Sequence, residues 1–266
     1  MKPHPERITE SPNRLLGGQV WHYSELASTN NLALELGQSL DVNPQWHGLA
    51  LRADRQTSGR GQHNRVWEAP ARRGVLLSVL LDPPAHCRRP AILTSWVAVA
   101  VSRVVESVIG WRPDLKWPND VLVRGQKIAG ILVEQRRGTV VGIGLNVWQT
   151  ADEFAAAGLP DATSLVRFVA NPPDVVEMTE NLLDAMDLDW RDLEQGNGAA
   201  VERRWREGLG LTGRPVRAVA RGDTILGYLE HLGWDEITLR LENGTARSFQ
   251  PEEISALAAL DGVSSG

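Results

Sequence analysis

Runs of apolar residues mark out strands along the first 150 residues. Val75–Leu81, VLLSVLL, is almost continuously apolar and lies between Gly74 and Asp82-Pro83-Pro84. This pattern is typical of a strand that is covered on both faces. Similar but shorter runs predict further strands at Gln19–Tyr23, Leu49–Ala53, Val121–Val123, Lys127–Val133 and Thr139–Val147.

Helical spacing appears between these runs. Ser28 or Thr29 supplies an N-cap, Leu32 and Leu36 form an inward stripe at i, i+4, and Gly37 ends the segment. A second helix is expected to begin at Pro90 and run through Val108 to Gly110, with further helices at about 174–190 and 199–207. Residues 1–18 are polar and carry several prolines and glycines, so we expect a loose leader there. The fold class predicted is α+β, a mixed sheet flanked by helices.

The pattern changes near Leu209. Short β-rich runs follow at Pro215–Ala220, Thr224–Leu232, Glu236–Leu241 and Thr245–Phe249, and Asn243-Gly244 is a strong hairpin signal. These strands predict a small barrel that is closed by Pro251–Ala256. We therefore expect two domains, 1–208 and 209–266.

Composition and charge exclude several classes of protein. Apolar residues make up 42% of the 266 residues and the net charge is −5, so the chain is globular and has no overall attraction for nucleic acid. The single cysteine, Cys87, excludes disulfides within the chain and a cysteine-rich zinc site. The N-terminus has no apolar core of a secretory signal, and the longest apolar run, around Ser95–Val101, is too short to span a bilayer. A cytoplasmic protein without membrane contact is expected.

The segment between Arg52 and Arg73 is basic, with six arginines and two acidic residues. Within it, Gly59-Arg60-Gly61 can approach a ligand closely. Arg60 and Arg65 offer planar forks to phosphate or carboxylate oxygens, and Trp67 offers a face for a base. This combination suits a nucleotide, although no Walker pattern is present. A solvated surface loop and a nucleic-acid patch are the two alternatives.

The segment Lys116-Trp117-Pro118-Asn119-Asp120 has the composition of a turn before a strand. Trp117 can anchor this turn to the core, which would hold Lys116 at the mouth of the sheet. An ammonium group there can neutralise charge that develops as a carboxylate attacks phosphorus. The alternative is a surface turn whose lysine stays in solvent.

Two predicted strands contain glycines, and glycine weakens a strand interior unless something requires it. Gly130, Gly142 and Gly144 would open a slot in which a flat bicyclic ligand could lie against bare backbone. A bulge or tight helix packing explains each glycine equally well. Asn146, at the end of the second strand, can meet a ligand edge or cap a turn.

Taken together, these segments resemble the biotin–protein ligase family, in its form without an N-terminal DNA-binding domain. The matching segments occur in the family's order: Ser28-Thr29-Asn30, Gln56–Trp67, Lys116–Asp120, Lys127–Leu132, Gly142–Asn146 and Thr163-Ser164-Leu165. The resemblance implies a catalytic core similar to class II aminoacyl-tRNA synthetases and a C-terminal SH3-like barrel. It also implies a two-step ligase reaction. Biotin and Mg-ATP give biotinyl-5′-AMP, and a lysine of a biotin carboxyl carrier domain then attacks the adenylate.

The resemblance also assigns roles to residues. Lys116 and Arg60 would be catalytic, with Lys116 between the biotin carboxylate and the α-phosphate. Biotin would contact Ser28, Thr29, Asn30, Gln56, Gly59, Arg60, Gly61, Gln62, Lys116, Gly130, Gly142 and Gly144. ATP and the adenylate would contact Arg60, Arg65, Trp67, Lys116 and Asn146, with Trp67 near adenine and Asn146 at the adenine edge. The metal ligands of the Mg²⁺ ion are not identified.

The basic loop departs from the family pattern, Gly-Arg-Gly-Arg-x-Gly-Arg-x-Trp, at two positions. Gln62 replaces the second arginine and Asn64 replaces the later glycine. Gln62 can form hydrogen bonds but cannot neutralise a phosphate. We therefore expect weaker retention of the adenylate, unless Arg65 compensates.

Some members of the family are also repressors with a helix-turn-helix domain. Only about 20 residues precede the first predicted strand, so we expect no DNA binding. A homodimer formed through the central sheet is a further expectation. Two rival functions remain, a lipoate–protein ligase of the same fold and a nucleic-acid-binding module built on the basic loop and the barrel.

Overall fold

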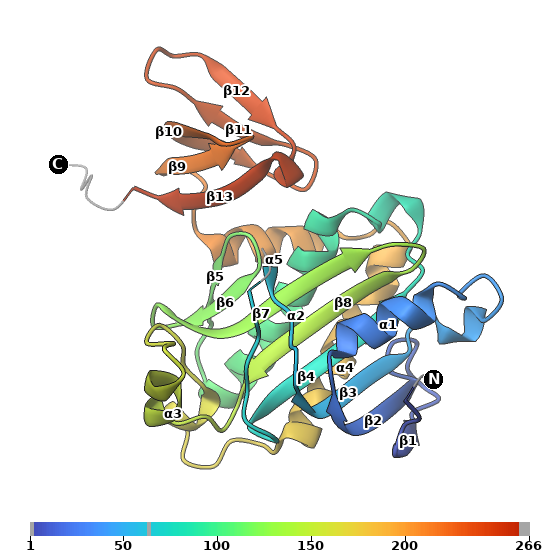
Figure 1. The fold of residues 1–266 in the computed structure, drawn as a ribbon. Coiled ribbons are helices and arrows are strands. Elements are labelled where there is room, and N and C mark those ends of the chain that lie inside the picture. Colours follow the sequence, from blue (N-terminus) through green and yellow to red (C-terminus); the bar gives the residue numbers. More distant parts are fainter. Residues whose placement is uncertain (1–2, 63–64, 261–266) are drawn as a thin grey trace.

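A computed structural model describes residues 3–62 and 65–260. Its larger sheet has eight strands in the order β1-β2-β3-β4-β8-β7-β6-β5 (Figure 1). Among the strands of the described residues only β2 and β3 pair in parallel, so the sheet is mixed, as predicted. The strands are β1 Arg7–Glu10, β2 Gln19–Leu26, β3 Ala50–Gln56, β4 Gly74–Leu81, β5 Asp114–Lys116, β6 Asp120–Val123, β7 Gln126–Gln135 and β8 Thr139–Asn146.

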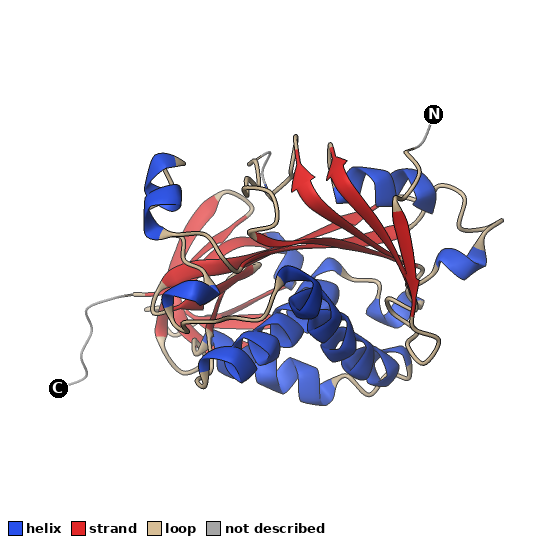
Figure 2. Ribbon diagram, turned by 90° about the horizontal axis from the view of Figure 1, so that it is seen from below, coloured by secondary structure: helices blue, strands red, loops and turns tan. Residues whose placement is uncertain are grey.

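Helices cover both faces of this sheet, unequally (Figure 2). Helix α1 packs on one face, where its Leu32 and Leu36 join a small core. The other face carries α2, α4 and α5 over a larger core, in which Trp96 and Trp190 have ring centroids 4.9 Å apart. The helices are α1 Thr29–Gly37, α2 Pro90–Ile109, α3 Ala151–Ala156, α4 Val175–Glu194 and α5 Ala199–Leu209. Short 3₁₀ turns lie at Pro44–Trp46, Ala85–Cys87, Leu165–Arg167 and Pro251–Glu253.

Helix α2 corrects one expectation. It runs for 20 residues with a mean hydropathy of 1.6, so it is long and apolar enough to cross a membrane by length and composition. Within the protein 72% of that apolar window is buried, between the larger sheet and α4. The expectation that the apolar run around Ser95–Val101 is too short to span a bilayer was wrong about length, because the helix extends through both flanks of that run. Its burial is that of a core helix.

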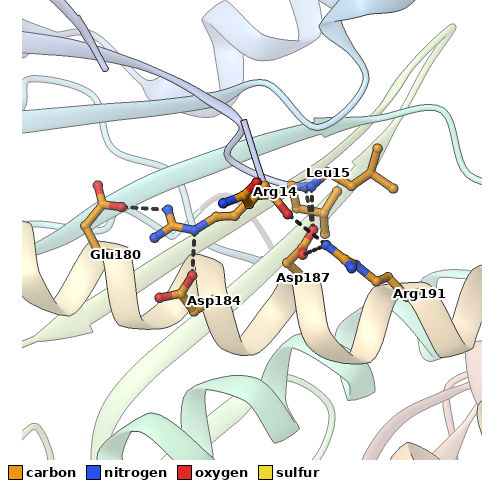
Figure 3. A network of polar contacts seen from close by, with 8 residues as sticks. Arg14, Leu15, Glu180, Asp184, Asp187 and Arg191 are labelled. Carbon is orange, nitrogen blue, oxygen red and sulfur yellow. Dashed lines mark hydrogen bonds and ion pairs between the residues drawn. The ribbon is translucent and has the colours of Figure 1, made fainter. Parts of the chain in front are cut away.

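Residues 3–18 are not a loose leader. Strand β1 pairs antiparallel with β2, and the segment between them is fixed to α4 (Figure 3). The Arg14 guanidinium donates to Glu180 (2.6 Å) and to Asp184 (2.5 Å). The Asp187 carboxylate accepts from the backbone N–H groups of Leu15 and Leu16, both at 2.8 Å. Arg14 and the backbone of Leu15 and Leu16 thus meet an acidic face of α4.

The C-terminal region forms a second, five-stranded antiparallel sheet, consistent with an SH3-like fold. Its order is β12-β11-β10-β9-β13. The Asn243-Gly244 turn joins β11 to β12 as expected. Gly244 has φ +81°, and the Asn243 side chain accepts from the N–H of Thr245 at 3.0 Å. The strands are β9 Pro215–Ala220, β10 Asp223–Leu232, β11 Ile237–Arg240, β12 Ala246–Phe249 and β13 Ile254–Ala259.

Polar contacts join the second sheet region to α2. The Trp234 indole donates to Ser95 Oγ at 2.7 Å. Arg89 forms ion pairs with Glu252 (2.7 Å) and Asp235 (2.9 Å). Side chains of both regions also belong to one continuous hydrophobic core. The C-terminal region is therefore packed onto the part of the chain that forms the larger sheet.

Candidate active site

A cavity of about 730 Å³ opens on the α1 side of the larger sheet. It brings together segments that lie far apart in the sequence. Of the predicted site residues, all but Gly59 line it: Ser28, Thr29, Asn30, Gln56, Arg60, Gly61, Gln62, Arg65, Trp67, Lys116, Gly130, Gly142, Gly144 and Asn146. Strand alternation explains part of this convergence, because the glycines of β7 and β8 all point toward α1.

The basic loop folds back on itself at the cavity rim. The Trp67 N–H donates to Gly59 O at 3.1 Å, and the Gly61 N–H donates to Arg65 O at 2.7 Å. A Cβ on Gly59 would lie 2.2 Å from Trp67 O, so only glycine permits this pairing. Gly59 thus shapes the loop without lining the cavity. The departure at Asn64 lies outside the described residues.

Most of the loop's arginines contact protein acids rather than the cavity. Arg52 and Arg72 both pair with Asp54, at 2.6 and 2.7 Å. Arg55 pairs with Glu25, and Arg73 lies 3.6 Å from Glu153. The positive charge offered to a ligand by this segment therefore comes from Arg60 and Arg65. Counting the arginines in the sequence overstated the positive charge that this segment offers to a ligand.

Arg60 is held in place by two neighbours. Its Nη2 lies 2.8 Å from Glu134 Oε1, and its Nη1 donates to Asn31 Oδ1 at 2.8 Å. The other Glu134 oxygen accepts from Asn30 Nδ2 at 3.0 Å. A carboxylate outside the cavity lining thus joins the basic loop to the start of α1.

The start of α1 and the end of β3 form a polar end of the cavity. Ser28 caps α1 and accepts from the Asn31 N–H at 3.4 Å, so the predicted N-cap is confirmed. Gln56 Oε1 accepts from the Thr29 N–H at 2.7 Å. Thr29 Oγ1 lies 3.1 Å from the same oxygen. This pairing leaves the Gln56 amide nitrogen as a donor for a ligand.

The turn that carries Lys116 is anchored as predicted. It connects β5 to β6, and Trp117 is buried beneath it. The Trp117 indole donates to Ile254 O at 2.9 Å, and the Asn119 amide donates to Ile131 O at 2.7 Å. Lys116 itself is exposed at the cavity and has no ion pair among residues 3–62 and 65–260.

Sequence reasoning missed a second lysine. Lys127, at the start of β7, also lines the cavity. Its Nζ lies 2.6 Å from Asp120 Oδ1 and 5.5 Å from the centroid of the Trp67 ring. The signal was its place at the head of KIAGIL, directly after the turn of Gly125. There the lysine was taken only as a strand residue.

The glycine slot needs a correction. The backbone is bare, but protein side chains occupy the space above it. A Cβ on Gly144 would lie 2.2 Å from Trp67 Cε2, and a Cβ on Gly142 would lie 2.2 Å from Asn30 Oδ1. A Cβ on Gly130 would come within 2.9 Å of the same indole. In this structure the glycines make room for Trp67 and Asn30.

Asn146 is buried and already bonded. Its Nδ2 donates to Thr163 O at 3.0 Å, and its Oδ1 accepts from the Gln149 amide at 2.8 Å. These contacts tie β8 to the segment that follows α3. That segment supplies a wall of the cavity, because the Lys127 N–H donates to Asp161 O at 2.7 Å. Sequence reasoning did not assign this wall, whose lining residues are Phe154, Gly158, Leu159, Pro160, Asp161 and Ala162.

The cavity carries few carboxylates. Within the described part of the chain, no group of three or more His, Cys, Asp or Glu side chains could hold a metal ion. The acids that line the cavity are Glu68, Asp120 and Asp161, and Asp120 already pairs with Lys127. Four cations line the cavity, Arg60, Arg65, Lys116 and Lys127. Arg60 and Lys127 are paired with Glu134 and Asp120, so Arg65 and Lys116 are the cations left to an anionic ligand among the described residues.

Comparisons with known proteins show which family the chain is similar to. The profile of the Biotin/lipoate A/B protein ligase family matches residues 18–149. The chain is 38% identical over 196 residues to the biotin--[acetyl-CoA-carboxylase] ligase of Mycobacterium tuberculosis, covering 68% of this chain and 70% of that protein. It is 31% identical over 264 residues to the bifunctional ligase/repressor BirA of Bacillus spizizenii, covering 93% and 79%. The structure of biotin protein ligase from Aquifex aeolicus in complex with biotin and ATP superposes with a TM-score of 0.74 at 25% identity, covering 91% and 99%.

Proposed function

The chain belongs to the biotin/lipoate A/B protein ligase family, and from this premise we propose that it is an ATP-dependent biotin–protein ligase. It forms biotinyl-5′-AMP from biotin and ATP and transfers the biotinyl group to a lysine of a biotin carboxyl carrier domain. One observation carries the assignment. A single cavity combines a polar end, at Ser28, Thr29 and Gln56, with cationic side chains that suit a carboxylate and a phosphate.

In the first step the biotin carboxylate attacks the α-phosphorus of ATP, and pyrophosphate leaves. Lys116 lies at the junction of the two anions, where its ammonium offsets their repulsion and the charge of the transition state. Its anchored turn supports this role, because burial of Trp117 fixes the lysine backbone. Lys127 adds a second cation on the same wall. Arg60 releases Glu134 or shares it when the phosphate arrives.

The polar end of the cavity binds the ureido ring of biotin, and the glycine-bearing strands lie beneath the ligand. Trp67 moves off Gly144 to cover the adenylate, and Asn146 positions the wall beside adenine. The described loop residues Gly59, Arg60, Gly61, Gln62 and Arg65 then cover the anhydride and exclude water. In the second step the carrier lysine attacks the acyl carbon, and AMP leaves.

Magnesium fits this site as a companion of ATP. Mg²⁺ is commonly bound through one or two carboxylates together with substrate phosphates. Glu68 and Asp161, which line the cavity, would hold it. The ion supplies charge neutralisation on the leaving pyrophosphate.

The partner proposed is the carrier domain of a biotin-dependent carboxylase. We further propose a cytoplasmic protein, a division into domains 1–208 and 209–266, and a homodimer formed through the larger sheet. Light scattering of the purified chain tests the dimer. A monomer at micromolar concentration contradicts it.

A direct experiment tests the assignment against a lipoate ligase. The protein is incubated with ATP and Mg²⁺ and with either biotin or lipoate, and the acyl-adenylate is detected by mass. Biotinyl-5′-AMP is expected, because a ureido ring needs the polar end whereas a dithiolane does not. Formation of lipoyl-adenylate alone would reverse the choice. A carrier domain added to the biotin reaction should gain one biotinyl group on its lysine.

A further inference from the structure

Polar side chains connect Arg60, in the basic loop, to the start of α1 and to β7. Glu134 lies near the end of β7, and only 18% of its side chain is exposed. One of its oxygens lies 2.8 Å from Arg60 Nη2, and the other accepts from Asn30 Nδ2 at 3.0 Å. Asn31 Oδ1 accepts from Arg60 Nη1 at 2.8 Å. Glu134 and Asn31 lie outside the cavity lining, so each acts on a ligand through the residues that it holds.

The position of Glu134 requires a carboxylate, because both of its oxygens face donors. A glutamine has one oxygen and one NH₂ group, so it can accept from Asn30 or from Arg60 but not from both. Asn30 is buried, and its Nδ2 also lies 3.5 Å from Leu132 O, so a reversed amide would bring two oxygens together. Loss of an acceptor costs a buried donor more than an exposed one. In Glu134→Gln the Asn30 bond is therefore kept, and Arg60, which is 38% exposed, is released.

The two partners fix the direction of the Arg60 guanidinium before a ligand arrives. A guanidinium has five N–H groups. Among the described residues, Asn31 occupies one of them at Nη1 and Glu134 lies against Nη2. The remaining N–H groups can meet an anion, since Arg60 lines the cavity. Ordering a long side chain on binding is unfavourable, and here the protein imposes that order in the absence of ligand.

We propose that Glu134 is a positioning residue, which orients Arg60 toward the reacting phosphate and offsets its charge in the ligand-free enzyme. The inference rests on the function proposed above. The carboxylate partly cancels the field of the guanidinium, so free ATP is attracted less strongly than it would be by an unpaired arginine. Where charge develops during adenylation, N–H groups that are already oriented stabilise it without reorganisation. Glu134 therefore favours turnover over ground-state binding.

Biotin-dependent pyrophosphate exchange, with ATP varied at saturating biotin, tests this role through kcat and KM. The proteins compared are wild type, Glu134→Gln, Arg60→Ala and the double variant. In Glu134→Gln we expect kcat to fall about tenfold, the effect of about one charge-assisted hydrogen bond, while KM for ATP stays the same or falls. In the Arg60→Ala background the same substitution should change kcat by less than twofold, because Glu134 acts through Arg60.

Asn31→Ala provides a second perturbation, because it removes the other partner of Arg60 from an exposed position. It should lower kcat by about threefold, the effect of about one neutral hydrogen bond, and again only when Arg60 is present. Agreement between the two variants would locate the effect at the guanidinium rather than at the Asn30 amide, which Asn31→Ala leaves untouched.

Glu180→Gln is the matched control. Glu180 on α4 pairs with Arg14 at 2.6 Å, joins distant segments of the chain in the same way, and lies outside the cavity lining. The substitution should lower Tm about as much as Glu134→Gln does, and it should leave kcat and KM within twofold of wild type.

Three results would overturn the inference. A rise in KM for ATP with kcat unchanged in Glu134→Gln would show a general loosening of the site. An equal loss of kcat with and without Arg60 would show that Glu134 acts through Asn30 instead. A kcat within twofold of wild type would show that Arg60 needs no carboxylate. A wild-type protein without biotin-dependent pyrophosphate exchange overturns the proposed function, and this result is read before any variant is made.

Discussion

Gly142→Ala should destabilise the protein through a single contact. The added Cβ would lie 2.2 Å from Asn30 Oδ1 and 2.8 Å from its Cγ. Ordinary contact begins near 3.4 Å, so the amide must retreat by about 1.2 Å. Asn30 is buried at the start of α1, and its amide is held by Ser78 and Glu134.

The size of the effect follows from what holds Asn30. A retreat of that length breaks its bonds to Ser78 (2.5 Å) and to Glu134 (3.0 Å), at about 1 kcal/mol each. Overpacking of a core position costs a further ~1–3 kcal/mol. The free energy of unfolding should therefore fall by about 3–5 kcal/mol. For a chain of this size that corresponds to a Tm lowered by roughly 6–20 °C.

Urea and thermal unfolding of four proteins test the reasoning: wild type, Gly142→Ala, Asn30→Ala and the double variant. Removal of the Asn30 side chain gives the new Cβ room, so the double variant should be no less stable than Asn30→Ala alone. Such non-additivity is expected of residues in contact. Additive losses, or a Tm of Gly142→Ala within 1 °C of wild type, would refute the steric account.

Three further predictions concern chemistry and pH. Lys116→Ala should lower adenylation by roughly 10²–10³, the effect of losing one preorganised charge-stabilising donor, and a near-normal rate of pyrophosphate exchange would remove its proposed role. Gln62→Arg should slow release of the adenylate by adding a cation at the cavity, and unchanged off-rates would show that this position does not reach the phosphate. Burial raises the pKa of Tyr23 from 10.0 to about 12, so the folded state disfavours its ionisation. The contribution of this group to the free energy of unfolding is complete below pH 10, and about 2–3 kcal/mol of it is lost as the pH rises toward 12. In urea unfolding, Tyr23→Phe should therefore lose correspondingly less stability than wild type between pH 9 and 11.5.

Elements with a complete local signal were predicted well from the sequence. Helix α2 has Pro90 at its start and Gly110, with φ +83°, at its end. Strand β4 is buried at every position, as its unbroken apolar run indicated. These elements carry their boundaries and their burial within a few neighbouring residues, so the chain itself is sufficient evidence.

Elements without such a signal were missed. Strand β5 has three residues and alternates exposed, buried, exposed, which is too short to show a period. Strand β1 is mostly exposed and is defined by its pairing with β2 rather than by apolar residues. Helix α3 was missed for a different reason. It has a capping box between Thr150 and Glu153, which is a local signal, but the sequence analysis did not use it.

The site shows the same limit. The basic loop, the turn of Lys116 and the glycine-bearing strands were recognisable because each is a continuous segment. Residues of all three line one cavity. The contacts between them were not predictable, because they depend on the register of β4, β7 and β8. Glu134 lies four residues beyond Gly130 on the same face of β7, yet its pairing with Arg60 requires the folded loop. Arginines of the basic segment are likewise neutralised by acids that lie far away in the sequence, as in the pairs of Arg55 with Glu25 and of Arg73 with Glu153.

The bond from the Trp117 indole to Ile254 O has a mechanical consequence. Ile254 is the first residue of β13, a strand of the second sheet, and its carbonyl supports the turn that carries Lys116. A displacement of the Ile254 carbonyl would therefore reach the Trp117 indole, and through it the residue next to Lys116. The two regions are separate in sequence, so a substitution at the start of β13 should disturb the position of a lysine that lies in the other sheet.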